Sequence, residues 1–302
     1  MLLYPAEPFA GRVPDEAYAA ELRNAEGRGL VTSVLDFKAL DAGDVTRALR
    51  WVPRAGEPGV TVYRGWMMRA EVYAALFDAL RERGWTLVNT PEQDLHTHHL
   101  PLSYDLIEDV TPRTAWVPGA APEAVDRVAV RSALASFGSH AVIVKDDVKS
   151  RKHEWHEACF VPDASDEAHA MRVVETFLAR QAEQFQDGLV LRAFEPFAAL
   201  TTHSRSGMPL TREYRLFVLD GRVVTSDAYW EEGEYGNEAV PLAPFEAVAH
   251  RVRSHFFTMD IARRTDGAWR VVELGDAQVA GLPERADRAR LYGALAKRLA
   301  RS

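Results

Sequence analysis

Charged side chains beside apolar segments are the first residues in this sequence that could do chemistry. Lys145 ends the apolar run of residues 141–144, and a polar segment that carries Lys149 and Lys152 follows it. A buried charge is costly unless it meets a partner, a metal or a ligand. A lysine at the end of a strand can hold a phosphate oxygen, because its ammonium is a compact charge on a long stem. A strand end followed by a solvated basic loop would contain the same residues.

Two arginines lie inside later apolar segments. Arg192 stands in the run of residues 190–194, and Arg215 stands in the run of residues 213–218. In the second run, the two-residue period of a strand places Glu213 on the same face as Arg215. This pair could be purely structural, or both side chains could face a ligand.

Three carboxylates form the strongest cluster. Asp260 belongs to the expected strand of residues 258–263, and Glu273 and Asp276 lie at the end of its partner strand. A short turn joins the two strands, so Asp260 should come opposite Glu273. Facing carboxylates repel unless cations neutralise them, and such hard oxygen ligands suit Mg²⁺ that also holds substrate phosphates. The alternative is one exposed carboxylate and another that is capped by backbone N–H groups.

Length and composition limit the classes of protein to consider. The 302 residues are about twice the usual size of a domain, so two domains are expected. The net charge of −8 disfavours general nucleic-acid binding, which needs a surplus of cations. The single cysteine, Cys159, should be a buried small side chain and fits a reducing cytoplasm. Residues 1–5 lack the features of a signal peptide, and no apolar run approaches the roughly 20 residues that span a bilayer. We therefore expect a soluble, cytoplasmic protein.

The elements that must position these residues begin with an alternation of strands and helices. Strands are expected at residues 30–37, 60–63 and 85–88. A helix is expected at residues 67–83, where apolar side chains recur at helical spacing. Strand, helix and strand in this order predict a small α/β layer with parallel strands.

Beyond a proline-rich stretch at residues 112–122, the expected elements change character. Helices are expected at residues 123–137, 167–185, 245–256 and 284–299, and strands at residues 141–145 and 188–194. Two antiparallel hairpins are expected at Asp220-Gly221 and Asp266-Gly267, because an Asp-Gly pair tolerates the positive φ of a tight turn. We therefore expect an α/β domain over residues 1–115 and an α+β domain over residues 116–302.

The order of these segments resembles the ATP-grasp superfamily, and within it the clade named for one arginine and two lysines. The resemblance rests on residues 144–152 (VKDDVKSRK), 191–194 (LRAF), 213–218 (EYRLFV) and 272–276 (VELGD), with Asp260 one strand before the last segment. It covers about residues 87–295. It implies an α+β ATP-grasp fold, preceded by a small α/β domain. ATP would bind between a central lobe of about residues 120–190 and a C-terminal lobe of about residues 190–302.

The resemblance also implies roles for individual residues. The catalytic charges would be Lys145, Arg192 and Arg215, the nucleotide would meet Lys145, Lys149, Lys152, Arg192, Phe194, Glu195 and Glu213, and Mg²⁺ would be held by Asp260, Glu273 and Asp276. Two positions depart from the family. Ala193 stands where relatives carry an acid, which Glu195 could replace at the ribose or adenine. Gly275 stands where the usual metal motif has asparagine, with Asp276 beside it.

The activity that the resemblance implies is the ATP-dependent ligation of a carboxylate to an amine through an acylphosphate. ATP and Mg²⁺ are the expected cofactors, and small-molecule or peptide carboxylates and amines are the expected substrates. One alternative is a regulatory nucleotide-binding module without turnover, which Ala193 suggests. Another is phosphoryl transfer to a hydroxyl or a nucleic-acid end, for which the basic strip at residues 145–152 would be the contact.

Three other segments invite functional interpretations. His96, His98 and His99 suggest zinc, but no cysteine or regularly spaced fourth ligand accompanies them, so a loop packed at the interdomain seam is expected. Residues 153–157 (HEWHE) resemble a metalloprotease helix, but their histidines are three rather than four residues apart, and they could line the nucleotide cleft instead. The acidic, aromatic residues 229–235 could favour an amine-bearing substrate or form a solvated loop.

Overall fold

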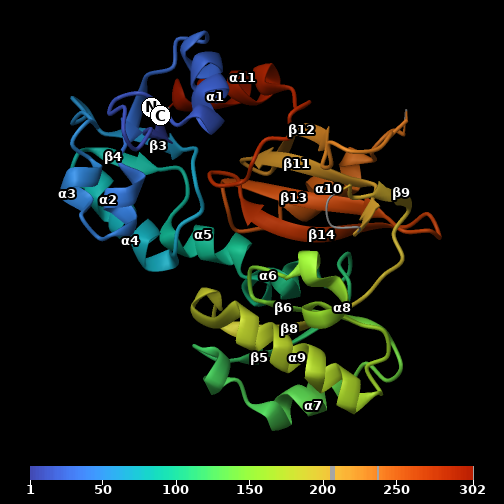
Figure 1. The fold of residues 1–302 in the computed structure, drawn as a ribbon. Coiled ribbons are helices and arrows are strands. Elements are labelled where there is room, and N and C mark those ends of the chain that lie inside the picture. Colours follow the sequence, from blue (N-terminus) through green and yellow to red (C-terminus); the bar gives the residue numbers. More distant parts are fainter. Residues whose placement is uncertain (205–207, 237, 302) are drawn as a thin grey trace.

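The computed structural model describes residues 1–204, 208–236 and 238–301, which form an N-terminal domain, a central lobe and a C-terminal lobe (Figure 1). The N-terminal domain has a parallel sheet, and each lobe is built on an antiparallel sheet. This arrangement confirms the predicted α+β fold with a small α/β domain before it. Among the described residues, no helix is both long and apolar enough to cross a bilayer.

The N-terminal sheet has the strand order β2-β1-β3-β4, with every neighbouring pair parallel. Its strands are β1 (Leu2–Pro5), β2 (Thr32–Leu35), β3 (Gly59–Tyr63) and β4 (Trp85–Leu87), and its helices are α1 (Glu16–Glu26), α2 (Phe37–Asp41), α3 (Val45–Ala48) and α4 (Ala70–Arg81). In α4 the buried side chains follow the helical period, as the spacing of apolar residues predicts. The predicted parallel layer is therefore confirmed.

The first strand of this sheet is one of the elements that the sequence pattern does not reveal. Strand β1 pairs with both β2 and β3, and Leu2, Leu3 and Tyr4 are fully buried. A strand that is covered on both faces has no alternation of polar and apolar residues to mark it. Residues 2–5 thus form an inner strand of the sheet, with a neighbour on each side.

Helices replace the expected loop around the three histidines. Helix α5 (Pro91–His98) begins with a capping box, in which Thr90 accepts from the Gln93 N–H and the Gln93 side chain accepts from the Thr90 N–H. Helix α6 (Leu100–Ile107) follows after His99. The prediction of a loop there was wrong, because the capping residues outweigh the weak helical pattern of the segment.

The central lobe is an antiparallel sheet of order β5-β8-β6-β7. Its elements are β5 (Thr114–Pro118), α7 (Arg127–Ala135), β6 (Val142–Asp146), α8 (Trp155–Ala158), β7 (Phe160–Val161), α9 (Glu167–Gln181) and β8 (Gly188–Ala193), with 3₁₀ turns η1 (Pro122–Ala124), η2 (Lys152–Glu154) and η3 (Ala182–Gln184). Apolar side chains of α7 and α9 form one core with the sheet. Helix α7 is shorter than the predicted helix at residues 123–137, because η1 precedes it.

The C-terminal lobe is a sheet of order β12-β11-β13-β14. Its elements are the small hairpin β9 (Ala199–Thr202) and β10 (Pro209–Thr211), the strands β11 (Glu213–Leu219), β12 (Arg222–Ala228), β13 (Phe256–Arg263) and β14 (Trp269–Asp276), and the helices α10 (Leu242–Ala249) and α11 (Arg288–Leu299). Both predicted hairpins are confirmed. The first turns through Asp220 at φ 48° and Gly221 at φ 76°, the positive values that a type I′ turn requires.

The expected domain boundaries fall inside strands. The central sheet begins at β5, so a boundary at residue 115 would divide that strand, and a lobe boundary at residue 190 would divide β8. Helix α11 returns to the N-terminal domain and lies beside α1 (Figure 1). Side chains of α1, β1 and α11 share one core with Phe217 and Phe256 of the C-terminal lobe. The N-terminal domain and the C-terminal lobe are therefore joined by a common hydrophobic core.

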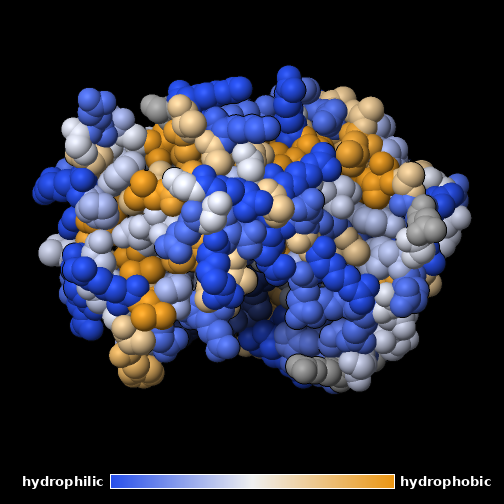
Figure 2. Space-filling model, turned by 90° about the horizontal axis from the view of Figure 1, so that it is seen from above, coloured by the Kyte–Doolittle hydropathy of each residue, from blue (hydrophilic) through white to orange (hydrophobic). Residues whose placement is uncertain are grey.

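The surface in Figure 2 is mainly hydrophilic, and its hydrophobic side chains form separate patches. A net charge of −8 over 302 residues agrees with this character. The residues drawn in colour on this face therefore form no single broad apolar area for a partner.

Candidate active site

One face of the C-terminal sheet carries the charged residues that the sequence pattern singles out. Asp260 of β13 lies directly opposite Glu273 of β14 and directly opposite Arg215 of β11. The alternate residues of the three strands point to the other face, where they pack with α6 and α10 in an apolar core. The predicted register of Asp260 and Glu273 is confirmed.

A bidentate ion pair neutralises the first of the two facing carboxylates. Arg215 donates from Nε to Asp260 Oδ1 at 2.8 Å and from Nη2 to Asp260 Oδ2 at 2.7 Å. Its Nη1 donates to the carbonyl oxygen of Gly281 at 3.1 Å, and its guanidinium lies 4.6 Å from the ring centre of Tyr229. Burial raises the pKa of the Asp260 carboxyl, and Arg215 opposes that rise. Arg215 therefore pairs with Asp260 and not with Glu213.

Lys145 neutralises the second carboxylate from the opposite lobe. It is the penultimate residue of β6 in the central lobe, and its Nζ donates to Glu273 Oε1 at 3.0 Å and to the carbonyl of Val148 at 3.2 Å. The side chain of Lys145 is 7% exposed, whereas that of Glu273 is 43% exposed and stays open to the cleft. Desolvation raises the pKa of Glu273, but Lys145 and Lys152 outweigh it and hold this pKa below its ordinary value.

Arg192 also reaches from the central lobe to β14. The pairing of β13 and β14 shifts after Asp260, so that Val272 forms a bulge just before Glu273. Arg192 of β8 donates to the carbonyls of Val272 and Val271, the latter at 3.2 Å, and to the hydroxyl of Thr111 at 2.6 Å.

Arg192 is a buried cation without an acidic partner. It is 8% exposed, and among the described residues no carboxylate lies within ion-pair distance of it and its Nε has no hydrogen-bond partner. Burial lowers its pKa to about 10, so it still carries its charge at neutral pH. Glu273 and Glu195 oppose this lowering from beyond ion-pair distance, and a buried cation whose hydrogen bonds all go to neutral acceptors suits an anionic ligand.

The two lysines after Lys145 differ in their surroundings. Lys149 is exposed, whereas Lys152 is partly buried beside Glu213 and Glu273. Burial lowers the pKa of Lys152, but these two carboxylates outweigh it and raise the pKa above its ordinary value. Burial likewise raises the pKa of Glu213, which accepts from the Thr211 hydroxyl at 2.6 Å. The structure thus brings Lys152 and Glu213 to the charged face and leaves Lys149 outside it.

The hinge between the lobes carries Phe194 and Glu195. Phe194 is 42% exposed and contacts the stacked rings of Trp155 and Phe160 edge-on. Glu195 Oε2 lies 3.5 Å from Arg264 Nη1 and 3.4 Å from Arg270 Nε, so it is occupied by two arginines of the C-terminal lobe. The segment of residues 153–157 therefore reaches the hinge through Trp155.

Asp276 lies apart from the other two candidate metal ligands. It pairs with Phe257, so its side chain points to the face of the sheet opposite Glu273. There it accepts from Asn89 Nδ2 at 2.6 Å and from the Gln278 N–H at 2.7 Å. Burial raises its pKa to about 7. The structure therefore brings Asp260 and Glu273 together and does not bring Asp276 to them.

His98 is a site residue that the sequence interpretation treats as a seam contact. Its Nδ1 lies 3.1 Å from Asp94 Oδ1, one helical turn away in α5. It lines a cavity of about 10 Å³ together with Lys145, Arg192 and Glu273. Burial lowers the pKa of His98, but Asp94 outweighs burial and raises it. Among the described residues, no group of three or more His, Cys, Asp or Glu side chains is placed to hold a metal ion.

A larger pocket opens beside Arg215. It has a volume of about 330 Å³. Its described lining combines aromatic, acidic and backbone groups and comprises His203, Leu210, Arg215, Tyr229, Trp230, Glu231, Glu232, Gly281, Leu282 and Pro283. Part of the acidic, aromatic segment of residues 229–235 thus faces a pocket. The pocket and the Asp260–Glu273 pair share Arg215 as their common wall.

Comparison with solved structures places this arrangement in a known fold. A RimK domain ATP-grasp protein from Sphaerobacter thermophilus superposes with a TM-score of 0.61 and 17% identity over 99% of this chain and 98% of that chain. D-cycloserine synthetase DcsG gives 0.59 and 17% over 99% and 98%. The ATP-grasp ligase PsnB, complexed with precursor peptide PsnA2 and AMPPNP, gives 0.57 and 17% over 99% and 96%.

The sequence itself identifies the family. Among curated proteins, no significant match is found. The model of an ATP-grasp domain family, the third family of the clade named for one arginine and two lysines, matches residues 136–295, which include the central lobe from β6 onward, the C-terminal lobe and the charged face between them. The chain belongs to the ATP-grasp superfamily, as a member of this third family of the clade.

Proposed function

We propose that this protein is an ATP-dependent carboxylate–amine ligase that forms an amide or peptide bond through an acylphosphate. The observation that carries the proposal is the meeting of the two lobes at one charged cluster, where Lys145 Nζ lies 3.0 Å from Glu273 Oε1. Arg192 of the central lobe and the Arg215–Asp260 pair of the C-terminal lobe belong to the same cluster. Cations and acids in one cleft are what a magnesium–triphosphate requires.

The donor set fits ATP with Mg²⁺. Magnesium in nucleotide sites is commonly held by one or two carboxylates together with phosphate oxygens. Asp260 and Glu273 supply two facing carboxylates, and Glu273 is open to the cleft. Arg192 supplies a buried charge that lacks an acidic partner among the described residues. The fold neighbour PsnB was solved with Mg and ADP, which agrees with this choice of cofactors.

Each residue would have a distinct part in the chemistry. When bound, Mg²⁺ would draw charge from the phosphate oxygens. Lys145, Lys152 and Arg192 would bind the triphosphate, and Arg215 would neutralise the γ-phosphoryl group as it moves. A substrate carboxylate oxygen would attack the γ-phosphorus and release ADP. The amine nitrogen would then attack the acyl carbon, lose a proton and displace inorganic phosphate.

The pocket beside Arg215 is the proposed place of the carboxylate and amine substrates. Its position next to the Arg215–Asp260 pair would hold an acceptor close to the transferred group. Glu231, Tyr229 and Trp230 give this pocket an acidic and aromatic lining, which favours an amine that bears a positive charge before it reacts.

A direct test measures ADP formation with Mg²⁺, ATP and pools of amino acids and peptides, followed by mass spectrometry of the products. Hydroxylamine as a surrogate amine would convert any acylphosphate into a hydroxamate, which is detected by its iron(III) complex. We expect ADP to form only when a suitable carboxylate is present. Tight nucleotide binding without ADP or hydroxamate from any pool would contradict the ligase proposal and would favour the regulatory module.

A further inference from the structure

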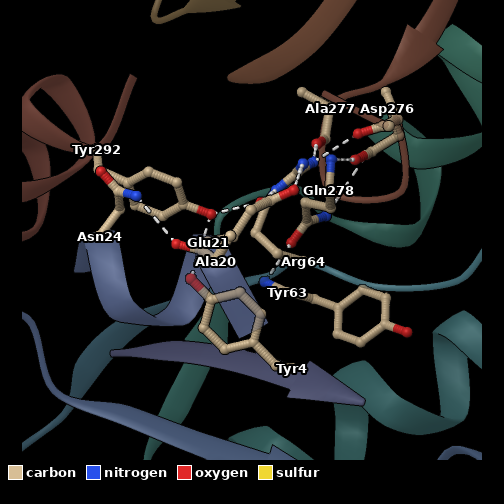
Figure 3. A network of polar contacts seen from close by, with 12 residues as sticks. Tyr4, Ala20, Glu21, Asn24, Tyr63, Arg64, Asp276, Ala277, Gln278 and Tyr292 are labelled. Atoms are coloured by element: carbon tan, nitrogen blue, oxygen red, sulfur yellow. Dashed lines mark hydrogen bonds and ion pairs between the residues drawn. The ribbon is translucent and has the colours of Figure 1, made fainter. Parts of the chain in front are cut away.

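A fully buried arginine links the N-terminal domain to the segment that follows β14. Arg64 has no exposed surface, and it donates from Nε to Glu21 Oε2 at 2.9 Å and from Nη2 to Glu21 Oε1 at 3.0 Å. Its Nη1 donates to the carbonyls of Ala277 and Ala280, the latter at 2.8 Å. Figure 3 shows this guanidinium between α1 and the segment after β14.

Stability alone is a poor explanation for such a group. A buried ion pair often contributes no more than well-packed apolar side chains of the same volume, because both charges lose their hydration. The geometry gives Arg64 a more specific task. Its planar fork binds the Glu21 carboxylate and two backbone carbonyls at once, which the point charge of a lysine cannot do.

The segment of residues 277–283 is held by the N-terminal domain at several further points. The Gly65 N–H donates to the Gln278 carbonyl at 3.1 Å, and the Tyr63 N–H donates to Gln278 Oε1 at 3.2 Å. Gln278 Nε2 donates to the Tyr73 hydroxyl at 2.6 Å. This segment therefore takes its position from the N-terminal domain.

The same segment reaches the proposed catalytic arginine. The carbonyl of Gly281 accepts from Arg215 Nη1 at 3.1 Å, and residues 281–283 line the 330 Å³ pocket. The Arg64 bond to Ala280 stands one residue before this carbonyl. A shift of the segment would thus move both a wall of the pocket and an acceptor of Arg215.

We propose that Arg64 is a positioning residue, which fixes residues 277–283 and, through Gly281, the guanidinium of Arg215 at the acceptor pocket. The catalytic half of this inference rests on the proposed ligase function, whereas the structural half does not. Arg64 contacts none of the cations that are proposed to bind phosphate, which are Lys145, Lys152 and Arg192. Its substitution should therefore leave nucleotide binding intact and impair phosphoryl transfer to the acceptor.

The test compares Arg64→Lys with Arg127→Lys in the full chain. Arg127 is a matched control, because it also forms a bidentate pair with a glutamate, Glu175, and donates to two backbone carbonyls, but it lies in the central lobe. We expect the amides of residues 277–282 to exchange hydrogen about tenfold faster in Arg64→Lys than in the wild type, and at the wild-type rate in Arg127→Lys. The kcat for ADP formation should fall between about tenfold and a hundredfold, with the KM for ATP within about twofold.

A second variant guards against a simple loss of folding. Arg64→Met combined with Glu21→Gln removes the buried charges together, so its melting temperature should stay closer to wild type than that of Arg64→Met alone. It should still show fast exchange at residues 277–283. Unchanged exchange there in both Arg64→Lys and the double variant would overturn the inference. A wild-type protein that forms no ADP would overturn the ligase function, while the exchange measurements would still decide whether Arg64 positions the segment.

Discussion

Replacing Lys145 with methionine removes one charge from the centre of the proposed nucleotide site and keeps most of the side-chain volume. In the free protein the Lys145 side chain is 7% exposed, and its ammonium donates to Glu273 at 3.0 Å. Glu273 would keep Lys152 nearby, and its 43% exposure would let water solvate it. We therefore expect the variant to fold, with a melting temperature close to that of the wild type.

The loss of affinity can be bounded from these contacts. A hydrogen bond to a charged group contributes about 1.5–3 kcal/mol, which corresponds to about 10- to 150-fold in affinity. When the wild type binds nucleotide, Lys145 would donate to a phosphate in place of the Glu273 carboxylate, so one charged acceptor replaces another. The net binding free energy that Lys145 contributes is therefore at the low end of this range. We expect Lys145→Met to weaken binding of a non-hydrolysable ATP analogue about tenfold.

Isothermal titration calorimetry with the analogue and Mg²⁺ measures this difference. Lys149→Met is the matched control, because it removes the same charge from the same segment at an exposed position. Its affinity should stay within about twofold of the wild type. If Lys145→Met bound the analogue as tightly as the wild type while Lys149→Met did not, Lys145 would not contact the triphosphate.

By the same titration, Lys152→Met should weaken nucleotide binding about tenfold, because Lys152 lies beside Glu213 and Glu273 on the charged face. Gly221→Ala should lower the free energy of unfolding in urea by about 1–2 kcal/mol, because its φ is 76° and the new Cβ would lie 2.7 Å from a ring nitrogen of His250. Burial raises the pKa of the Cys159 thiol to about 11, so iodoacetamide at neutral pH should modify the thiol only in the unfolded protein, as mass spectrometry would show. Burial raises the pKa of Asp276 from 3.8 to about 7. Between these two pH values the folded state binds more protons than the unfolded state. The stability that this group contributes should therefore fall as the pH rises from about 4 to about 7. Urea titrations across this range should show a smaller pH dependence in Asp276→Asn than in the wild type.

Local chemistry explains which parts of the fold were predictable. The Asp220-Gly221 turn and the helical spacing in α4 are signals within a few residues, and both are confirmed. Strand β1 carries no such signal, because it is buried on both faces and defined only by its neighbours. The ends of β5 and β8 depend equally on long-range pairing, so the expected boundaries at residues 115 and 190 fall inside them.

The candidate site divides in the same way. The sequence predicts the hairpin that brings Asp260 and Glu273 near each other, but their direct pairing also needs the bulge, because an unbroken two-residue period from the Ile261–Val271 pair would place Asp260 opposite Val272. The position of Asp276 on the other face follows from the same two-residue period. Asp276 was a candidate ligand because it would add a third carboxylate to the cluster. The bulge at Val272 and the approach of His98 depend on contacts between distant segments. No pattern within either segment could have indicated them.

The bulge that presents the Val271 and Val272 carbonyls to Arg192 has a kinetic consequence. Swinging the central lobe away from β14 must detach one guanidinium from both carbonyls and from the Thr111 hydroxyl together. These acceptors are neutral, so dissolved ions have little to screen there, unlike at the Lys145–Glu273 pair. The barrier that Arg192 sets to separation of the lobes should consequently be largely indifferent to ionic strength, whereas the part set by the Lys145–Glu273 pair should fall as salt is added.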